Sequence, residues 1–356
     1  MVALQKSDSL TWQAASALVL SICAAISFPS IASAEHPDAI QSATILTYHR
    51  FGEPNFPSTN IKSEQFESHL KELTSGRYKL LPLPEITRAF RNRENLPARA
   101  VAVTVDDAYR SIYEIAWPKL RRFGIPLTVF VSPAFLDGGS KTYMSWDQLR
   151  ELAAAGVTIG GHTFSHPHMP ELSDTELSEE IDRANQRFMA ELGYRPTLFA
   201  YPYGEYGIRE KAAIQNAGYE AAFGQQSGVA ASSSDLFELP RFSMSESYGG
   251  LERLKLVANA LPIPAHDVMP KDMVLREGNN PPDFGFTITT KVLNIDRLAC
   301  FASNQSKPAR IERLGPDRFE IRLDDPFRPP RGRINCTIPT NDGRWRWFGQ
   351  QFYVRE

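Results

Sequence analysis

The sequence has no excess of charge of either sign. Its 39 Lys and Arg residues and 41 Asp and Glu residues leave a formal net charge of −2. No basic stripe stands out, so nothing points to a nucleic-acid partner. A mean hydropathy of −0.32 argues against a polytopic membrane protein. Internal repeats are absent, and 356 residues are too many for one small domain and few for three.

The longest apolar run lies at the N-terminus. Residues 10–28 are apolar and Ala-rich, and Ala32-Ser33-Ala34 follows as a small-x-small cleavage signal. This pattern predicts a secretory signal peptide over residues 1–34. An uncleaved membrane anchor is the alternative, because the run approaches spanning length. We expect an exported bacterial protein, periplasmic or extracellular, with no stable membrane insertion after cleavage.

Cysteine is scarce, with three in the chain. Cys23 is removed with the predicted signal peptide, which leaves Cys300 and Cys336. An even number of cysteines in an exported protein predicts a disulfide between them. Two buried free thiols are the alternative.

Strand-like and helix-like patterns alternate from Ala43 to about Leu261, which predicts parallel strands with helices outside. The strand-like runs are 43–48, 100–105, 126–131, 157–160, 197–200 and 219–223, and the helix-like runs are 63–74, 110–123, 146–155, 173–192 and 208–217. In parallel α/β barrels the C-terminal strand ends carry the active site. Side chains that follow these strands should therefore converge on one rim.

After residue 270 strand-like runs follow one another without helices, which predicts a small β-sandwich domain over 271–356 and a first domain over 35–270. The runs are 284–290, 310–314, 319–323, 333–338 and 345–354. Trp345 and Trp347 share one face of the last run, because side chains alternate along a strand. They form either a sugar-stacking surface or part of the core.

Two carboxylates and two imidazoles follow strand-like runs. Asp106 and Asp107 come directly after 100–105, and His162 and His166 follow 157–160. A divalent metal could be bound by Asp107, His162 and His166, with coordination positions left open for water and substrate. Zn²⁺ is the first choice, and Co²⁺ and Ni²⁺ are the alternatives. Adjacent carboxylates point to opposite sides of the backbone, so Asp106 is free to act as the general base. Solvated acids in a turn and loop histidines are the alternatives.

Three ordered segments resemble the motifs of NodB-type polysaccharide deacetylases, the family-four carbohydrate esterases. They are Thr-Val-Asp-Asp-Ala-Tyr at 104–109, similar to Thr-Phe-Asp-Asp-Gly; His-Thr-Phe-Ser-His-Pro at 162–167, similar to His-(Ser/Thr)-x-x-His-Pro; and Ala-Tyr-Pro-Tyr-Gly at 200–204, similar to Arg-x-Pro-(Tyr/Phe)-Gly. Leu-Thr-Tyr-His at 46–49 is similar to the first strand of many members. The resemblance covers roughly residues 45–261.

The resemblance implies a distorted (β/α)7-type barrel, the NodB homology domain, before the small β-sandwich. It implies a hydrolase of non-peptide carbon–nitrogen bonds that removes acetyl groups from a polysaccharide, usually N-acetyl groups of amino sugars. It also implies the ligand set and base given above, with the Tyr203 backbone N–H helping to hold the oxyanion. Tyr109 is a candidate for lining the sugar groove, with packing against the next helix as the alternative.

The chain departs from the family pattern at two points. The arginine of the third motif is Ala200 here, and Arg241 is the candidate replacement, with an ordinary surface arginine as the alternative. The late motif that supplies the general acid is not clear. His266, which Asp267 could orient, is the first candidate, and His168 and His49 are rivals. An O-acetyl esterase and a non-catalytic polysaccharide-binding or assembly protein therefore stay open as alternatives.

Overall fold

The computed structural model describes residues 40–288 and 290–355. The predicted signal peptide lies outside the described residues. Residues 40–356 form one compact unit by the clustering of their contacts. Within the described residues, no helix is both long and apolar enough to cross a membrane.

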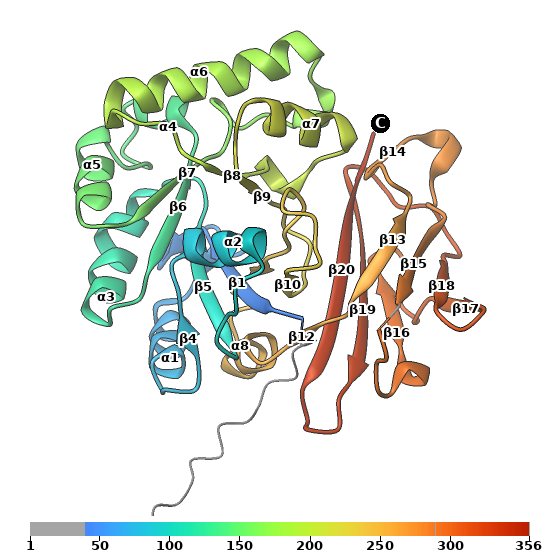
Figure 1. Cartoon of the computed structure of the whole chain (residues 1–356). Coiled ribbons are helices and arrows are strands. Elements are labelled where there is room, and N and C mark those ends of the chain that lie inside the picture. The colour runs from blue at the N-terminus through green and yellow to red at the C-terminus, as the bar shows by residue number, and fades with distance from the viewer. Residues whose placement is uncertain (1–39, 289, 356) are drawn as a thin grey trace, which may run out of the picture. The chain divides into compact units, whose positions relative to one another are not determined.

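The first part of the chain builds a curled, mostly parallel nine-stranded sheet (Figure 1). Its parallel strands are β4 (Lys79–Leu80), β1 (Ser42–Tyr48), β5 (Ala100–Val105), β6 (Leu127–Val131), β7 (Thr158–Gly161), β8 (Leu198–Ala200), β9 (Ala221–Phe223) and β11 (Phe242–Ser243), and β10 (Ala230–Ala231) pairs antiparallel with β1. Two short strands, β2 (Arg50–Phe51) and β3 (Asn60–Ile61), pair separately. This arrangement agrees with the predicted barrel class.

Eight α-helices surround this sheet in Figure 1 or lie in its connections. They are α1 (Ser63–Leu73), α2 (Leu83–Asn92), α3 (Trp117–Arg122), α4 (Pro133–Asp137), α5 (Trp146–Ala154), α6 (Asp174–Leu192), α7 (Ile208–Asn216) and α8 (Leu251–Ala258). The longest, α6, starts at a capping box formed by Ser173 and Glu176, and Gly193 ends it in the left-handed region. The predicted helix at 110–123 is helical over 110–122, with a π-helical turn, η1 (Ile112–Ala116), that continues into α3.

Helices on the outside explain why the central strands are apolar along their whole length. Every residue of β5, Ala-Val-Ala-Val-Thr-Val, is buried. A strand of a parallel sheet is covered on one face by helices and on the other by the barrel interior, so both faces select apolar residues. The first polar side chains after β5 are Asp106 and Asp107, at the rim where the strand ends.

The last part of the chain forms two further sheets. One has the order β12 (Leu261–Pro262), β20 (Trp345–Val354), β19 (Arg331–Pro339) and β16 (Ala299–Ala302), with β14 (Val274–Leu275) also on β20; the other has the order β13 (Ala265–Met269), β15 (Phe284–Ile288), β18 (Arg318–Arg322) and β17 (Arg310–Leu314). Phe286 and Phe348 meet between them with ring centroids 5.3 Å apart. The sheets thus share a core, and their first strands precede residue 271.

The two tryptophans of β20 have different surroundings. Trp347 packs edge-on against Phe242 at 5.3 Å between ring centroids and donates its indole N–H to Asn335 Oδ1. Trp345 is exposed at 37%. They therefore do not form one shared core face.

A disulfide joins Cys300 in β16 to Cys336 in β19, as predicted. The two residues are directly opposite each other in the antiparallel pair, and both are fully buried. The bridge joins two residues that are 36 positions apart in the sequence, and so closes a loop of that length. By the loop-entropy account, such a loop contributes about 3–4 kcal/mol to the free energy of unfolding.

We expect reduction of this disulfide to lower the free energy of unfolding by about 3 kcal/mol, because the unfolded chain regains the entropy of the open loop. Denaturant unfolding with and without a thiol reductant measures the change. A Cys300→Ala/Cys336→Ala variant serves as control, since reductant should not alter its midpoint. Titration of two free thiols in the unreduced, denatured protein would contradict the bridge.

Candidate active site

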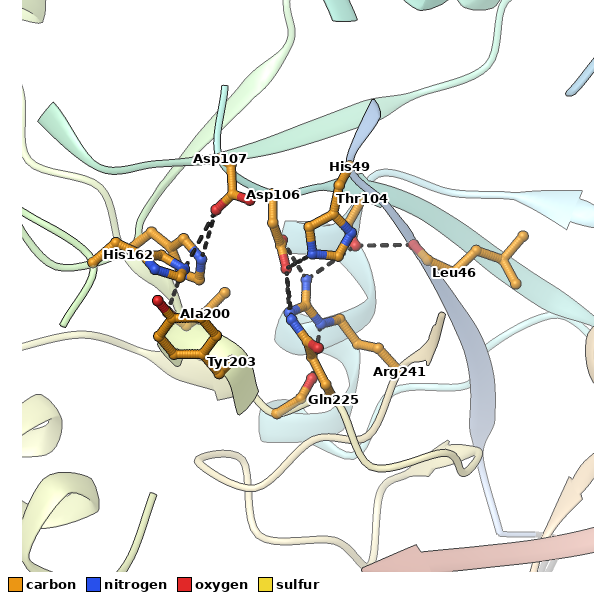
Figure 2. Close-up of polar contacts among 12 residues, drawn as sticks. Leu46, His49, Thr104, Asp106, Asp107, His162, Ala200, Tyr203, Gln225 and Arg241 are labelled. Carbon is orange, nitrogen blue, oxygen red and sulfur yellow. Dashed lines mark hydrogen bonds and ion pairs between the residues drawn. The ribbon is translucent and has the colours of Figure 1, made fainter. Parts of the chain in front are cut away.

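The register between β1 and β5 brings the first two candidate residues together. Tyr48 is opposite Val105 in this parallel pair, and Asp106 donates its backbone N–H to Tyr48 O at 3.0 Å. The next side chains along both strands are therefore neighbours at the rim. His49 Nε2 lies 3.8 Å from Asp106 Oδ2 (Figure 2).

Asp107, His162 and His166 form the predicted metal-ligand cluster. Asp107 Oδ1 lies 3.5 Å from His162 Nε2 and 3.4 Å from His166 Nε2, and one ligand atom from each residue lies within 4.8 Å of the others. Asp107 and His166 both have positive φ angles, 71° and 63°. These strained backbone positions turn the side chains of Asp107 and His166 toward one point. Figure 2 shows the side chain of Asp107 directed at that of His162.

The protonation of this cluster fits a bound cation. His162 Nδ1 lies 2.6 Å from Ala200 O; a carbonyl only accepts, so Nδ1 carries a proton, and in the neutral ring Nε2 then presents a lone pair to Asp107. Burial lowers the pKa of His166 to about 4, so its ring is neutral at pH 7. Asp107 Oδ1 is buried and accepts no hydrogen bond from the described residues. Three facing lone pairs with no proton between them are the donor set of a divalent metal.

Asp106 is held by a buried arginine. Arg241 Nη1 donates to Asp106 Oδ1 at 2.7 Å and Nη2 to Oδ2 at 2.8 Å, and both side chains are fully buried. Burial by itself would raise the pKa of Asp106, but the Arg241 guanidinium together with His162 and His49 outweighs it, and the pKa lies below its usual value. Asp106 is therefore a carboxylate at neutral pH, oriented by a two-pronged ion pair.

Arg241 reaches Asp106 from inside the sheet, below the rim. It precedes β11, whose Phe242 is level with Leu46 in β1, so the side chain must extend toward the rim. On the way it meets Thr104 Oγ1 at 3.3 Å and donates its Nε–H to Gly224 O at 2.9 Å. The structure therefore places Arg241 against the carboxylate that the missing arginine at Ala200 would contact in the family.

The third motif forms a tight turn beside the cluster, η3 (Pro202–Gly204). Tyr203 adopts the left-handed region with φ 57° and ψ 4°, and its ring meets that of His166 at 4.4 Å between centroids. Two hydrogen bonds close the turn: Gly204 N–H donates to Tyr201 O, and Glu205 N–H donates to Pro202 O. The Tyr203 N–H takes no part in these two turn bonds.

The side chain of Tyr109 is packed between neighbouring side chains and is not open to solvent. Its side chain is 9% exposed, its ring stacks on Tyr143 at 5.1 Å, and the Arg50 guanidinium carbon lies 3.6 Å from the ring centroid. This surrounding supports the packing alternative, and a role in sugar binding stays a prediction.

The three candidate acids are placed very differently. His49 lies next to Asp106, whereas His266 lies on β13 opposite Thr287 of β15, without a side-chain hydrogen bond or ion pair to the described residues. His168 Nδ1 pairs with Glu205 Oε2 at 2.6 Å, and its ring stacks on Tyr203 at 4.2 Å. Glu205 and Gln225 were not predicted as site residues, because no motif includes them. Gln225 Nε2 lies 3.5 Å from Asp106 Oδ2.

Known proteins share both the motifs and the fold. A family model described as polysaccharide deacetylase matches residues 93–222. The chain carries a polysaccharide deacetylase domain. A putative polysaccharide deacetylase of Bacillus subtilis is 26% identical over 58% of this chain and 72% of its own length. The poly-beta-1,6-N-acetyl-D-glucosamine N-deacetylase of Staphylococcus aureus is 24% identical over 58% of this chain and 79% of its own.

Solved structures of polysaccharide deacetylases have the same fold. The Streptococcus pyogenes deacetylase PplD, solved with acetate, superposes with a TM-score of 0.57 at 23% identity, and 62% of this chain matches 99% of that one. IcaB from Ammonifex degensii gives a TM-score of 0.55 at 24% identity over 62% of this chain and 98% of its own. The deacetylase fold is thus matched almost completely by less than two thirds of this chain.

We expect His162→Ala and Asp107→Asn to abolish binding of stoichiometric divalent metal, because each removes one of three convergent donors. Metal analysis of the purified proteins by mass spectrometry measures the content. His266→Ala is the matched control and should keep wild-type metal content. Full metal content in either ligand variant would contradict the assigned cluster.

Proposed function

We propose that this protein removes acetyl groups hydrolytically from a polysaccharide, in the first instance N-acetyl groups of an amino-sugar polymer. The observation that carries the proposal is the pair of adjacent aspartates in a polysaccharide deacetylase domain. One, Asp106, is an ionised carboxylate locked onto Arg241. The other, Asp107, meets His162 and His166 in a donor set for a divalent metal. A candidate general base and a candidate metal site thus lie side by side.

The proposed reaction joins water to the acetyl carbonyl carbon and breaks the bond from that carbon to nitrogen. Asp106 takes one proton from the attacking water, and the nitrogen gains a proton as it leaves, so the products are acetate and a free amine. A divalent metal on Asp107, His162 and His166 would supply Lewis acidity for the carbonyl and a lowered pKa for water. In this proposal the backbone N–H of Tyr203 shares the charge that develops on the carbonyl oxygen.

His49 is the best placed of the three histidines to protonate the leaving nitrogen. Its Nε2 is 3.8 Å from Asp106 Oδ2, and its side chain is 15% exposed. The acid and the base of such a reaction act on atoms bonded to the same carbon, so they must stand close together. His266 lies on another sheet and His168 is already paired with Glu205. We therefore assign the general acid to His49 in place of His266.

Poly-β-1,6-linked N-acetylglucosamine is the first substrate to test, because relatives that match this chain over 79% of their length carry that activity in their names. We further propose export through a signal peptide over residues 1–34 and Zn²⁺ as the resident metal. The sheets that follow the barrel are proposed to form an accessory β-sandwich domain that begins at β12, about ten residues before the predicted boundary at 271. An O-acetyl esterase on the same site would instead release acetate only from esters.

Asp106→Asn should lower acetate release from the polymer by about 10²-fold or more, because the carboxylate that accepts the proton is gone. Acetate is assayed on poly-β-1,6-N-acetylglucosamine, on an O-acetylated polysaccharide and on an aryl acetate. Asp137→Asn is the matched control, since Asp137 pairs with Arg187 away from the cluster, and it should keep wild-type rates. Circular dichroism verifies folding, because Asp106→Asn leaves the buried Arg241 unpaired.

Wild-type rates in Asp106→Asn would sink the assignment of the base. Acetate from the ester substrates alone would favour the esterase. Binding of the polymer with no acetate from any substrate would favour a non-catalytic role.

His49→Ala should lower the rate of acetate release from the N-acetylated polymer by about 10²-fold, because an unprotonated amine is a poor leaving group. His168→Ala and His266→Ala are made in parallel and compared by kcat. The assignment predicts that His49→Ala has the largest loss of kcat of the three variants on the N-acetylated polymer. On an aryl acetate, whose leaving group needs no proton, the loss of kcat in His49→Ala should be much smaller. A larger loss in His266→Ala would return the acid role to that residue.

A further inference from the structure

One strand of the C-terminal sheets is buried on both faces. All six residues from Gly349 to Val354 in β20 are buried. Side chains alternate along a strand, so residues 348, 350, 352 and 354 share one face and 349, 351 and 353 share the other. Phe348 and Phe352 pack on Phe284 within the sheets. The second face must therefore be covered by something else.

That second face lies against the loops of the deacetylase barrel. A side chain at Gly349 would place its Cβ 2.0 Å from Ser227 O, so the two backbones are in direct contact there. Tyr353 Oη donates to Glu171, close to the metal motif. Between them, Gln351 Nε2 donates to Tyr203 O at 2.9 Å and to Gly204 O at 3.0 Å.

The orientation of this carboxamide is determined by its neighbours. Arg333 Nε donates to Gln351 Oε1 at 2.9 Å, and a guanidinium offers no acceptor, so the oxygen must face Arg333 and the NH₂ group must face the turn. Both N–H bonds and the carbonyl of Gln351 are then satisfied. The side chain is 2% exposed, which removes competition from water for these bonds.

The turn that Gln351 holds is strained. Tyr203 has φ 57° and Gly204 has φ 70°, and a left-handed conformation costs a non-glycine residue about 1–2 kcal/mol. Such a conformation persists only where its surroundings over-determine it. Within the turn, bonds from Gly204 N–H and Glu205 N–H hold the preceding peptides. The two carbonyls after the Tyr203 α-carbon are held from outside, by Gln351.

A second contact from the C-terminal sheets supports the same turn. Arg331 Nε lies 2.9 Å from Glu205 Oε1, and Glu205 Oε2 pairs with His168 at 2.6 Å. The His168 ring in turn stacks on Tyr203. The turn is therefore bracketed by residues of β19 and β20.

We propose that Gln351 is a positioning residue for the reaction proposed above, on which this inference rests. Its carboxamide holds the left-handed Tyr203–Gly204 turn so that the Tyr203 N–H is presented to the oxygen of the scissile acetyl group. The C-terminal sheets thereby form part of the active site. An oxyanion donor contributes only when it is held in place before the transition state forms.

Gln351→Glu tests the donor with little change of shape, because a carboxylate still accepts from Arg333 but cannot donate to the two carbonyls. We expect kcat for acetate release to fall about 10- to 100-fold, KM to change by less than about twofold, and metal content to stay at the wild-type level. We expect the same changes in kcat, KM and metal content for Gln351→Ala. Tyr353→Phe, two residues along on the same face, loses its bond to Glu171 without touching the turn and should keep the wild-type kcat.

Amide hydrogen exchange of the peptide covering 201–205 gives a readout that needs no activity. Exchange should be faster in both Gln351 variants than in wild type and in Tyr353→Phe. Should the Gln351 variants fail to fold, Arg333→Ala serves instead: it frees the carboxamide to rotate and should also lower kcat and speed exchange. Wild-type kcat and exchange in these variants, or equal losses in Tyr353→Phe, would overturn the inference. A wild-type protein that releases no acetate would refute the proposed function alone, because exchange still tests the hold on the turn.

Discussion

The buried ion pair between Asp106 and Arg241 is the interaction on which the site depends. A carboxylate with no exposed surface is stable as an anion only if a cation and hydrogen bonds replace the lost water. Arg241 supplies both through its two-pronged contact, and it does so from inside the sheet. The strand ends must therefore stay in register, since a shift of one residue would turn Asp106 away from the interior.

Much of the barrel was predictable because the signals are local. The run 100–105 coincides with β5, and the polar residues at the end of β5 mark the rim. Outside the barrel, the run 310–314 coincides with β17 of a C-terminal sheet. The metal ligands could be proposed because Asp107, His162 and His166 each follow such a strand. Helices α2, α4 and α8 were not predicted, although Leu83, Ile86 and Phe90 occur at helical spacing and bury one face of α2.

The remaining site residues depend on distances that sequence order does not reveal. His266 stands late in the chain, where the family carries its acid, yet strand β13 places it on another sheet. His49 lies 57 positions before Asp106 and becomes its neighbour only through the pairing of β1 with β5. Arg241 could be proposed because a known cation was missing at Ala200. Gln351 had no such signal, because a glutamine in a strand is unremarkable until its partner is known.

The strained turn explains why side chains outside the barrel matter to a reaction carried out inside it. A left-handed tyrosine is less stable than its extended form unless contacts hold it. The barrel supplies the turn's internal bonds, the rings of His166 and His168 and the close approach of Gln225 to Gly204. A solved relative is matched over 99% of its length by 62% of this chain. Residues on β19 and β20, which lie outside the segment 93–222 that the family model matches, meet the turn here. Stability of the C-terminal sheets and orientation of the oxyanion donor are therefore coupled through the carboxamide of Gln351.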